Sequence, residues 1–258
     1  MGLHVHEFGP ADGRPVLALH GLTGHGRRYA DLAGRLGARY RVLAPDLRGH
    51  GASPVLPPWD LDALVADVVE VLDRYATGPV PVLGHSLGGV VALRLAGAVP
   101  ERVSGLALLD PGTGMLPEKA LRNADRMLAD ESYADVAEAR ADRVLNGWSG
   151  FPDSTVDTEV ADHLARRADG RWTWRYHRPA MVALMSALTR PVPLPPAGLP
   201  TLLVIGAKSG VVRDGWRDAC RAALSDRLTV VTLPCGHLVQ QEEPAATATA
   251  VADHLAAL

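Results

Sequence analysis

A serine that could act as a nucleophile lies in a glycine-rich turn. The run Gly84-His85-Ser86-Leu87-Gly88 follows an apolar stretch at 80–83 and precedes a good helical segment at 90–96. Small residues at both ends of such a strand-to-helix connection permit a sharp turn that leaves the serine exposed. The N-terminus of the following helix favours negative charge that develops beside the serine. The context therefore predicts that Ser86 is a nucleophile for acyl transfer, rather than an incidental serine in a turn.

Two further loops could complete the same site. The run His20-Gly21-Leu22-Thr23-Gly24 ends an earlier apolar stretch, and its glycines allow main-chain N–H groups to face a ligand. In an oxyanion hole one amide comes from this loop and one from the residue after the nucleophile, so the candidates are Leu22 and Leu87. The run Pro234-Cys235-Gly236-His237 follows the last apolar stretch, where a loop histidine can reach the serine. His237 is the candidate general base.

These loops need a sheet that brings strand ends together. Six short runs rich in Val, Ile and Leu recur along the chain, at residues 16–20, 41–45, 80–83, 105–109, 202–205 and 228–233. Runs that are apolar on both faces are typical of a parallel sheet covered by helices. Helix-period segments lie between them, and residues 61–75 carry one apolar stripe. The alternation predicts an α/β fold.

The alternation stops between residues 112 and 196. Charged amphipathic segments follow one another there without a clear strand, and we expect helices at 118–129, 133–145, 158–167 and 178–188. We predict a core of residues 1–111 and 197–258 with a helical cap inserted at 112–196. Aromatic and Met side chains are concentrated in this insertion, namely Trp148, Trp172, Trp174, Tyr176, Met181 and Met185. They would line an apolar substrate pocket or pack the cap, and the sequence leaves both interpretations open.

The order of the motifs resembles the α/β-hydrolase superfamily across almost the whole chain. The run Pro45-Asp46-Leu47-Arg48-Gly49-His50-Gly51-Ala52-Ser53 lies between the His20 and Ser86 motifs, and Gly236-His237 follows them, as in that family. The segments Leu108-Leu109-Asp110-Pro111 and Cys235-Gly236-His237 further resemble an actinobacterial lipase/esterase type called LipV. The resemblance implies an eight-stranded, mostly parallel sheet with a helical cap between its sixth and seventh strands. It also implies a serine esterase or lipase that cleaves carboxylic esters through a Ser-His-Asp triad.

The sequence departs from the family pattern at the catalytic acid. That acid usually ends a Gly-x-x-Asp run after the seventh strand, and this chain has Gly206-Ala207-Lys208-Ser209 there. A serine cannot hold a negative charge against the imidazolium that forms on His237. Asp110 is the preferred replacement, because it ends a strand on the same sheet edge and some family members, including haloalkane dehalogenases, carry their acid there. Asp214 is the alternative acid.

Composition limits the partners of the protein. The chain has 258 residues, 47% of them hydrophobic and 21% charged, with a formal net charge of -3, as in ordinary globular proteins. No basic face for nucleic acid is expected. No run reaches the roughly 18 apolar residues of a membrane span, and the N-terminus lacks a signal-peptide pattern. We therefore expect a cytoplasmic protein without integral membrane association, acting on a small, largely apolar acyl substrate of short or medium chain, with no cofactor.

Several histidines and cysteines outside these motifs have ordinary interpretations. His4 and His6 lie two residues apart on an expected edge strand, and hence on one face, as a metal pair requires. No third ligand is evident, so a solvated strand face is favoured and no metal is expected. His25, close to the proposed oxyanion loop, could touch substrate, but an exposed loop histidine is the favoured interpretation. Cys220 and Cys235 lack metal or CxxC spacing and are expected to be free, buried thiols.

Other functions remain open at this point. The same residues could serve thioester, lactone or carbon–carbon bond hydrolysis, because the superfamily places many reactions on one triad. Epoxide hydrolase and dehalogenase chemistry is disfavoured, since those relatives use an aspartate where Ser86 stands. A non-catalytic receptor that binds a ligand on the same fold is a further alternative. Ser209 in the place of the acid favours it, whereas the retained serine, histidine and oxyanion loop favour an enzyme.

Overall fold

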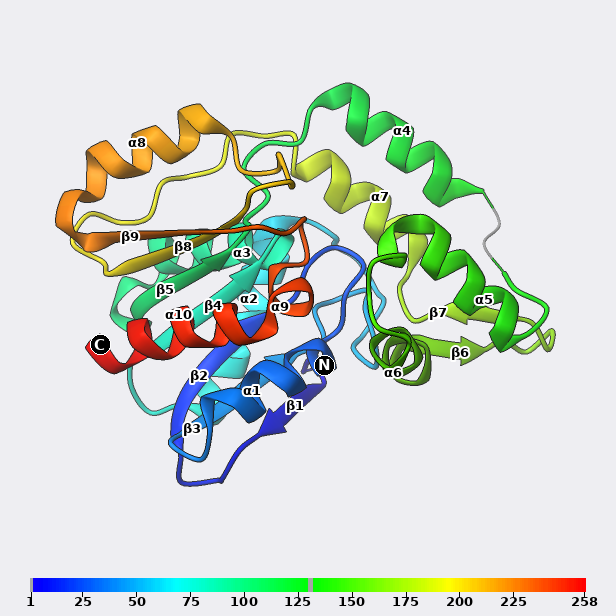
Figure 1. Ribbon diagram of the computed structural model, residues 1–258, viewed down its shortest axis with the longest axis horizontal. Helices are drawn as coiled ribbons and strands as arrows, with labels where there is room; N and C mark the ends of the chain where they lie inside the picture. Colours follow the sequence, from blue (N-terminus) through cyan, green and yellow to red (C-terminus); the bar gives the residue numbers. More distant parts are fainter. Residues whose placement is uncertain (1, 130–131) are drawn as a thin grey trace.

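The computed structural model describes residues 2–129 and 132–258 and has a central sheet with helices on both faces (Figure 1). Its strands are β1 (Val5–Phe8), β2 (Arg14–Leu19), β3 (Tyr40–Pro45), β4 (Val80–His85), β5 (Val103–Leu109), β8 (Thr201–Gly206) and β9 (Leu228–Leu233). The sheet order is β1-β3-β2-β4-β5-β8-β9, and β1 alone runs antiparallel to its neighbour among these strands. The predicted α/β fold is confirmed. The resemblance implied eight strands, however, and the described residues place seven in this sheet: the six apolar runs and one N-terminal edge strand.

Helices cover the two faces of the sheet in separate groups. One face carries α1 (Ala30–Leu36), α9 (Val239–Glu242) and α10 (Pro244–Ala257), and the other carries α2 (Leu61–Tyr75), α3 (Leu87–Ala98) and α8 (Asp214–Leu224). Short 3-10 helices occur at Gly26–Tyr29, Pro100–Arg102 and Ser225–Arg227. Each central strand supplies both cores by alternation: Val16 and Ala18 of β2 pack on the α1 side, and Leu17 and Leu19 on the α2 side. None of the described helices is long and apolar enough to span a bilayer.

The chain between β5 and β8 forms the group of elements at the right and top of Figure 1. It contains α4 (Pro117–Leu128), α5 (Val136–Arg143), a π-helical turn (Val144–Trp148), α6 (Asp153–His163), β6 (Leu164–Arg166), β7 (Trp172–Trp174) and α7 (Arg178–Ala187). A helix overlaps each of the four predicted helical segments. The expectation of no strand was wrong, because β6 and β7 form an antiparallel hairpin. Strands of three residues are too short to show a period of two in the sequence.

This insertion has a small apolar core and a separate attachment to the main core. Trp148 and Trp174 pack with other apolar side chains of α5, α6 and β6 in a cluster distinct from those that flank the sheet. Met181 and Leu184 of α7, by contrast, belong to the main core and are fully buried. The separate cluster agrees with the predicted cap. Its boundaries at residues 112 and 196 stay a prediction.

Candidate active site

Ser86 lies in a sharp turn between β4, a central strand, and α3. Its backbone has φ 52° and ψ -114°, a left-handed conformation that costs free energy for a residue with a side chain. The flanking glycines allow the approach, since a Cβ on Gly88 would lie 2.0 Å from the Leu19 carbonyl oxygen. A Cβ on Gly84 would lie 2.4 Å from the Gly88 oxygen. The predicted strand–turn–helix around Ser86 is therefore present, and the serine borders a cavity.

His237 connects Ser86 to Asp110. It follows β9, and its Nε2 atom lies 2.9 Å from the Ser86 Oγ atom. Its Nδ1 atom lies 2.5 Å from Asp110 Oδ2. With the proton on Nδ1, the ring donates to the carboxylate and leaves Nε2 free to accept the serine proton. The three residues come from the ends of β4, β5 and β9, which meet at one edge of the sheet.

Asp110 is a fully buried carboxylate with two further donors. Its Oδ1 atom accepts from the Gly206 amide at 3.1 Å, and its Oδ2 atom accepts from the Ser209 hydroxyl. Ser209 occupies the position where the family usually has its catalytic acid, and in this chain it donates a hydrogen bond to the carboxylate of Asp110. Asp214 lies at the start of α8 with an 82% exposed side chain and pairs with Arg217 at 3.0 Å. The structure thus brings Asp110, and not Asp214, to His237.

The two predicted oxyanion donors come from the residue after Ser86 and from the loop after the neighbouring strand β2. Leu87 is the first residue of α3, so its N–H has no partner within the helix. Leu22 lies in the loop after β2 and borders the same cavity as Ser86. Among the described residues, neither N–H donates to another main-chain group. Both amides are therefore available to a ligand oxygen at Ser86.

Buried histidines hold the Leu22 loop in place. The ring of His50 lies 2.9 Å from the Leu22 carbonyl oxygen, and the His20 Nδ1 atom lies 2.8 Å from the Gly21 oxygen. His20 Nε2 accepts from the Leu47 amide at 2.9 Å. Burial, and next the His50 charge, keep the pKa of His20 well below 6.5, so the ring stays neutral and can donate at one nitrogen and accept at the other. These contacts join residues far apart in sequence, so no local pattern indicates them.

Two neighbours of His237 differ in what they do: His85 holds its main chain, and Cys235 carries a thiol that stays protonated. His85 donates from Nε2 to the His237 carbonyl oxygen at 2.9 Å, and the two rings are 4.7 Å apart. Burial, and next the charge of His237, lower the pKa of His85 well below 6.5. Cys235 is a free, buried thiol, as predicted, and burial raises its pKa to about 11. A protonated thiol is a poor nucleophile, so Cys235 does not compete with Ser86.

The cavity beside Ser86 has a volume of about 310 Å³ and is mostly apolar at its walls. Its apolar side chains are Leu22, Met115, Met185, Leu188, Val211 and Leu238. The tryptophans of the insertion do not line it and pack in the apolar cluster of the insertion, whereas Met185 does line it. The predicted apolar pocket therefore holds for Met185 and was wrong for the tryptophans. Three cationic side chains also border the cavity, Arg28, Lys119 and Arg213, and no carboxylate does among the residues described.

A buried ion pair joins the insertion to the loop that follows β2. Glu159 of α6 accepts from Arg28 at 2.5 and 2.9 Å, and it lies 3.1 Å from His25 Nε2 and 3.4 Å from Arg143. Burial alone would raise the pKa of Glu159, but the Arg28 charge and the hydrogen bonds from His25 and Arg28 hold it well below 4.5. The expectation that His25 is exposed was wrong, because α6 covers it. Charged residues far apart in sequence give no local signal of such a contact.

His163 makes the stability of the protein depend on pH. The ring is fully buried, stacks on His25 at 4.5 Å, and has no hydrogen-bond partner for either nitrogen among the described residues. Burial lowers its pKa well below 6.5. The stability that the neutral ring contributes is full above pH 6.5 and is lost as the pH falls toward the folded-state pKa, because the unfolded chain binds the proton first.

We therefore expect His163→Phe to flatten the dependence of stability on pH. The change keeps a ring in the stack and removes one titration. That titration is worth up to about 1.4 kcal/mol per pH unit where the unfolded histidine is charged and the folded one is neutral, from about one unit below pH 6.5. Urea unfolding of both proteins at several pH values measures the two slopes. The slope is the readout, so a change in absolute stability from the larger ring does not affect the comparison. Equal slopes would contradict the assignment.

Comparison with known proteins places the chain in a family. Residues 16–250 match the alpha/beta hydrolase family. The chain is 39% identical to lipase LipV of Mycobacterium tuberculosis over 98% of this chain and 97% of that protein. It is 25% identical to esterase YbfF of Escherichia coli over 93% and 92%. The solved structure of E-2-(acetamidomethylene)succinate hydrolase shares the fold, with a TM-score of 0.85 at 22% identity over 98% of this chain and 95% of that one. The chain belongs to the alpha/beta hydrolase family.

Proposed function

We propose that this protein is a serine hydrolase that cleaves carboxylic esters, with Ser86 as nucleophile, His237 as general base and Asp110 as acid. The observation that carries the proposal is the continuous line of contacts from Ser86 Oγ to His237 Nε2, and from His237 Nδ1 to a fully buried carboxylate. A serine on a strained turn at the wall of a cavity, paired with an oriented imidazole, is an activated nucleophile. The names of the lipase and esterase relatives support ester bonds as the target.

The geometry supports acyl transfer in two steps. Ser86 Oγ attacks the ester carbonyl as His237 Nε2 takes its proton, and Asp110 stabilises the imidazolium. The negative charge on the carbonyl oxygen is held by the Leu22 and Leu87 amides. The alcohol leaves with the proton from His237, which leaves an acyl group on Ser86. Water, deprotonated by His237, then attacks the acyl-enzyme, the bond to Ser86 Oγ breaks as His237 returns the proton to that oxygen, and the acid is released.

The cavity supports a short or medium acyl chain. Its volume of about 310 Å³ lies at the small end of ligand pockets, and its walls are Met, Leu and Val side chains. Lys119 and Arg213 also border the cavity, so the charged side chains at its wall are cationic. The proposed cap forms part of the wall through Met115 and Met185. The expected cytoplasmic location stays a prediction.

The interpretation of the protein as a non-catalytic receptor loses the observation that favoured it. That interpretation depended on Ser209 in the place of the acid, and Ser209 instead donates to Asp110. Thioester, lactone and carbon–carbon bond hydrolysis use the same three side chains. The ester relatives favour carboxylic esters over these alternatives.

A fluorophosphonate probe and a series of p-nitrophenyl acyl esters test the proposal. We expect the probe to label the protein, Ser86→Ala to abolish both labelling and turnover, and turnover to fall for acyl chains too long for the cavity. Ser149→Ala is the matched control, because Ser149 is exposed in the insertion. It should label and turn over like the unchanged protein. No labelling, together with no turnover of esters, thioesters or lactones, would refute the proposal that the protein is an enzyme.

A further inference from the structure

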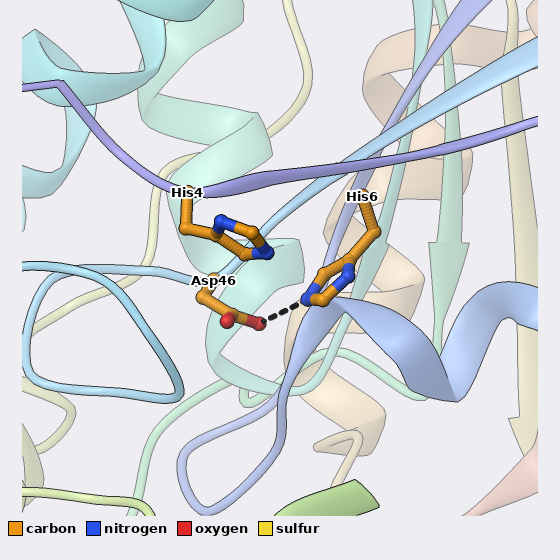
Figure 2. A group of neighbouring side chains, drawn as sticks. All are labelled: His4, His6 and Asp46. Carbon is orange, nitrogen blue, oxygen red and sulfur yellow. Dashed lines mark hydrogen bonds and ion pairs between the residues drawn. The ribbon is translucent and has the colours of Figure 1, made fainter.

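Two histidines and a carboxylate meet at the edge of the sheet. His4 precedes β1, His6 lies in it, and Asp46 follows β3. β1 pairs antiparallel with β3 with Val5 opposite Pro45, and the Asp46 amide donates to the His4 carbonyl oxygen at 2.9 Å. His4 and Asp46 are therefore opposite each other across the pair, and His6 is on the same face two residues along. Figure 2 shows the three side chains gathered around one space.

We propose that His4, His6 and Asp46 bind a divalent transition-metal ion of the Zn²⁺ type, with water completing the coordination. One candidate ligand atom from each residue lies within 4.8 Å of the other two. Three protein ligands plus water is the arrangement of open zinc sites. Two imidazoles and one carboxylate favour Zn²⁺, Ni²⁺ or Cu²⁺ over Mg²⁺ and Ca²⁺, which prefer oxygen ligands alone.

The distance between His6 and Asp46 already suits a shared ion. His6 Nε2 lies 3.1 Å from Asp46 Oδ1. Two ligands at about 2.0–2.1 Å from a tetrahedral ion are themselves about 3.3 Å apart, so these atoms need little movement. His4 is exposed at the surface, and its ring contacts the His6 ring edge to face at 4.6 Å. Rotation of this exposed side chain brings its ring nitrogen toward the ion, and its exposure gives the ion a path from solvent.

Main-chain amides fix the orientation of the carboxylate. Asp46 is buried, its Oδ1 atom accepts from the Gly26 amide at 2.7 Å, and its Oδ2 atom accepts from the Ala52 amide at 2.9 Å. Hydrogen bonds of this kind orient metal-binding carboxylates and raise metal affinity. An ion at this position would tie the edge strand to β3 and to the 3-10 helix that begins at Gly26. The group shares no residue with the proposed catalytic site.

The sequence indicated a solvated strand face because the third ligand, Asp46, is distant along the chain. His4 and His6 were expected to bind no metal because no third donor lay near them. Asp46 is 40 residues from His6, and only the pairing of β1 with β3 brings it to their face. The ordinary alternative is a His6–Asp46 ion pair with His4 as a bystander. The two interpretations differ in what His4 does.

Titration of Zn²⁺ into the protein, followed by calorimetry and by thermal unfolding, tests the role of His4. We expect one site, a Tm that rises with Zn²⁺, and no such rise with Mg²⁺ or Ca²⁺. His4→Asn removes a protein ligand, so it should weaken Zn²⁺ binding by at least the roughly 10–100-fold that loss of an outer hydrogen-bond partner costs, and abolish the rise in Tm. It leaves the His6–Asp46 contact in place, so the variant should fold. The visible absorption bands of bound Co²⁺ should appear with the unchanged protein and be lost with the variant at the same Co²⁺ concentration.

His177→Asn is the matched control, because His177 is a partly exposed imidazole away from the proposed site, with its ring 5.1 Å from the ring of Trp59. It should bind Zn²⁺ like the unchanged protein. Equal Zn²⁺ affinity in His4→Asn and the unchanged protein would overturn the site. Binding that is lost in His237→Asn and retained in His4→Asn would also overturn it, since the ion would then occupy the catalytic histidine.

Discussion

Asp110→Asn should lower kcat for a p-nitrophenyl ester by about 10⁴ while KM changes little, as the equivalent change does in a serine protease. The asparagine retains the size of the side chain but carries no charge to stabilise the imidazolium on His237. Its amide also donates where the carboxylate accepted, which favours the ring form with the proton on Nε2. That form cannot accept the proton of Ser86, whose Oγ lies 2.9 Å from Nε2. Steady-state kinetics on the purified variant measure the loss.

Two control variants separate the acid from its surroundings. Asp214→Asn should leave kcat unchanged, because that side chain is 82% exposed and pairs with Arg217. Ser209→Ala should cause a smaller loss than Asp110→Asn, because the Gly206 amide still holds Oδ1 of the carboxylate. If Asp110→Asn retained activity within about tenfold, or Asp214→Asn caused the larger loss, Asp110 would not be the acid.

Glu159→Gln should lower the free energy of unfolding by about 3–5 kcal/mol, the range seen when one partner of a buried ion pair is removed. The side chains of Arg28 and Arg143 are 7% and 12% exposed, and both would lose their carboxylate. A glutamine fills the same space and accepts one hydrogen bond but does not balance the two charges. Urea denaturation at pH 7, followed by circular dichroism, measures the difference.

Asp162→Asn is the control on the same helix. Asp162 pairs at 2.8 Å with Arg27, whose side chain is 50% exposed, and exposed ion pairs contribute less than about 1 kcal/mol. Arg28 also donates to the Thr23 carbonyl oxygen at 3.2 Å in the loop that carries Leu22. We therefore expect Glu159→Gln to reduce turnover as well. Equal stability of the two variants would show that the buried pair does not hold the insertion in place.

Local patterns in the chain predicted the elements that carry the site. The strand–turn–helix around Ser86 was recognisable because its glycines and its two flanking elements are adjacent in sequence. Five of the six parallel strands were recognisable because strands buried on both faces are continuously apolar. The sixth, β9, lies at the sheet edge and was recognisable from its Leu, Val and Thr residues. The hairpin of β6 and β7 was missed because each strand has three residues. The expectation of an eighth strand followed from the family resemblance, and the apolar runs themselves did not predict it.

The sequence by itself determined that Ser86 lies on a turn after a buried strand and that a histidine lies on the loop after the last strand. It also narrowed the acid to two aspartates, because a serine in the usual place cannot carry charge. Only the tertiary structure decided between them: the end of β5 puts Asp110 against His237, and α8 carries Asp214 to the surface. Likewise, only the tertiary structure brings Glu159 against Arg28 and Asp46 beside His6. Each of these contacts depends on how distant elements pack, and that information is not present in the spacing of neighbouring residues.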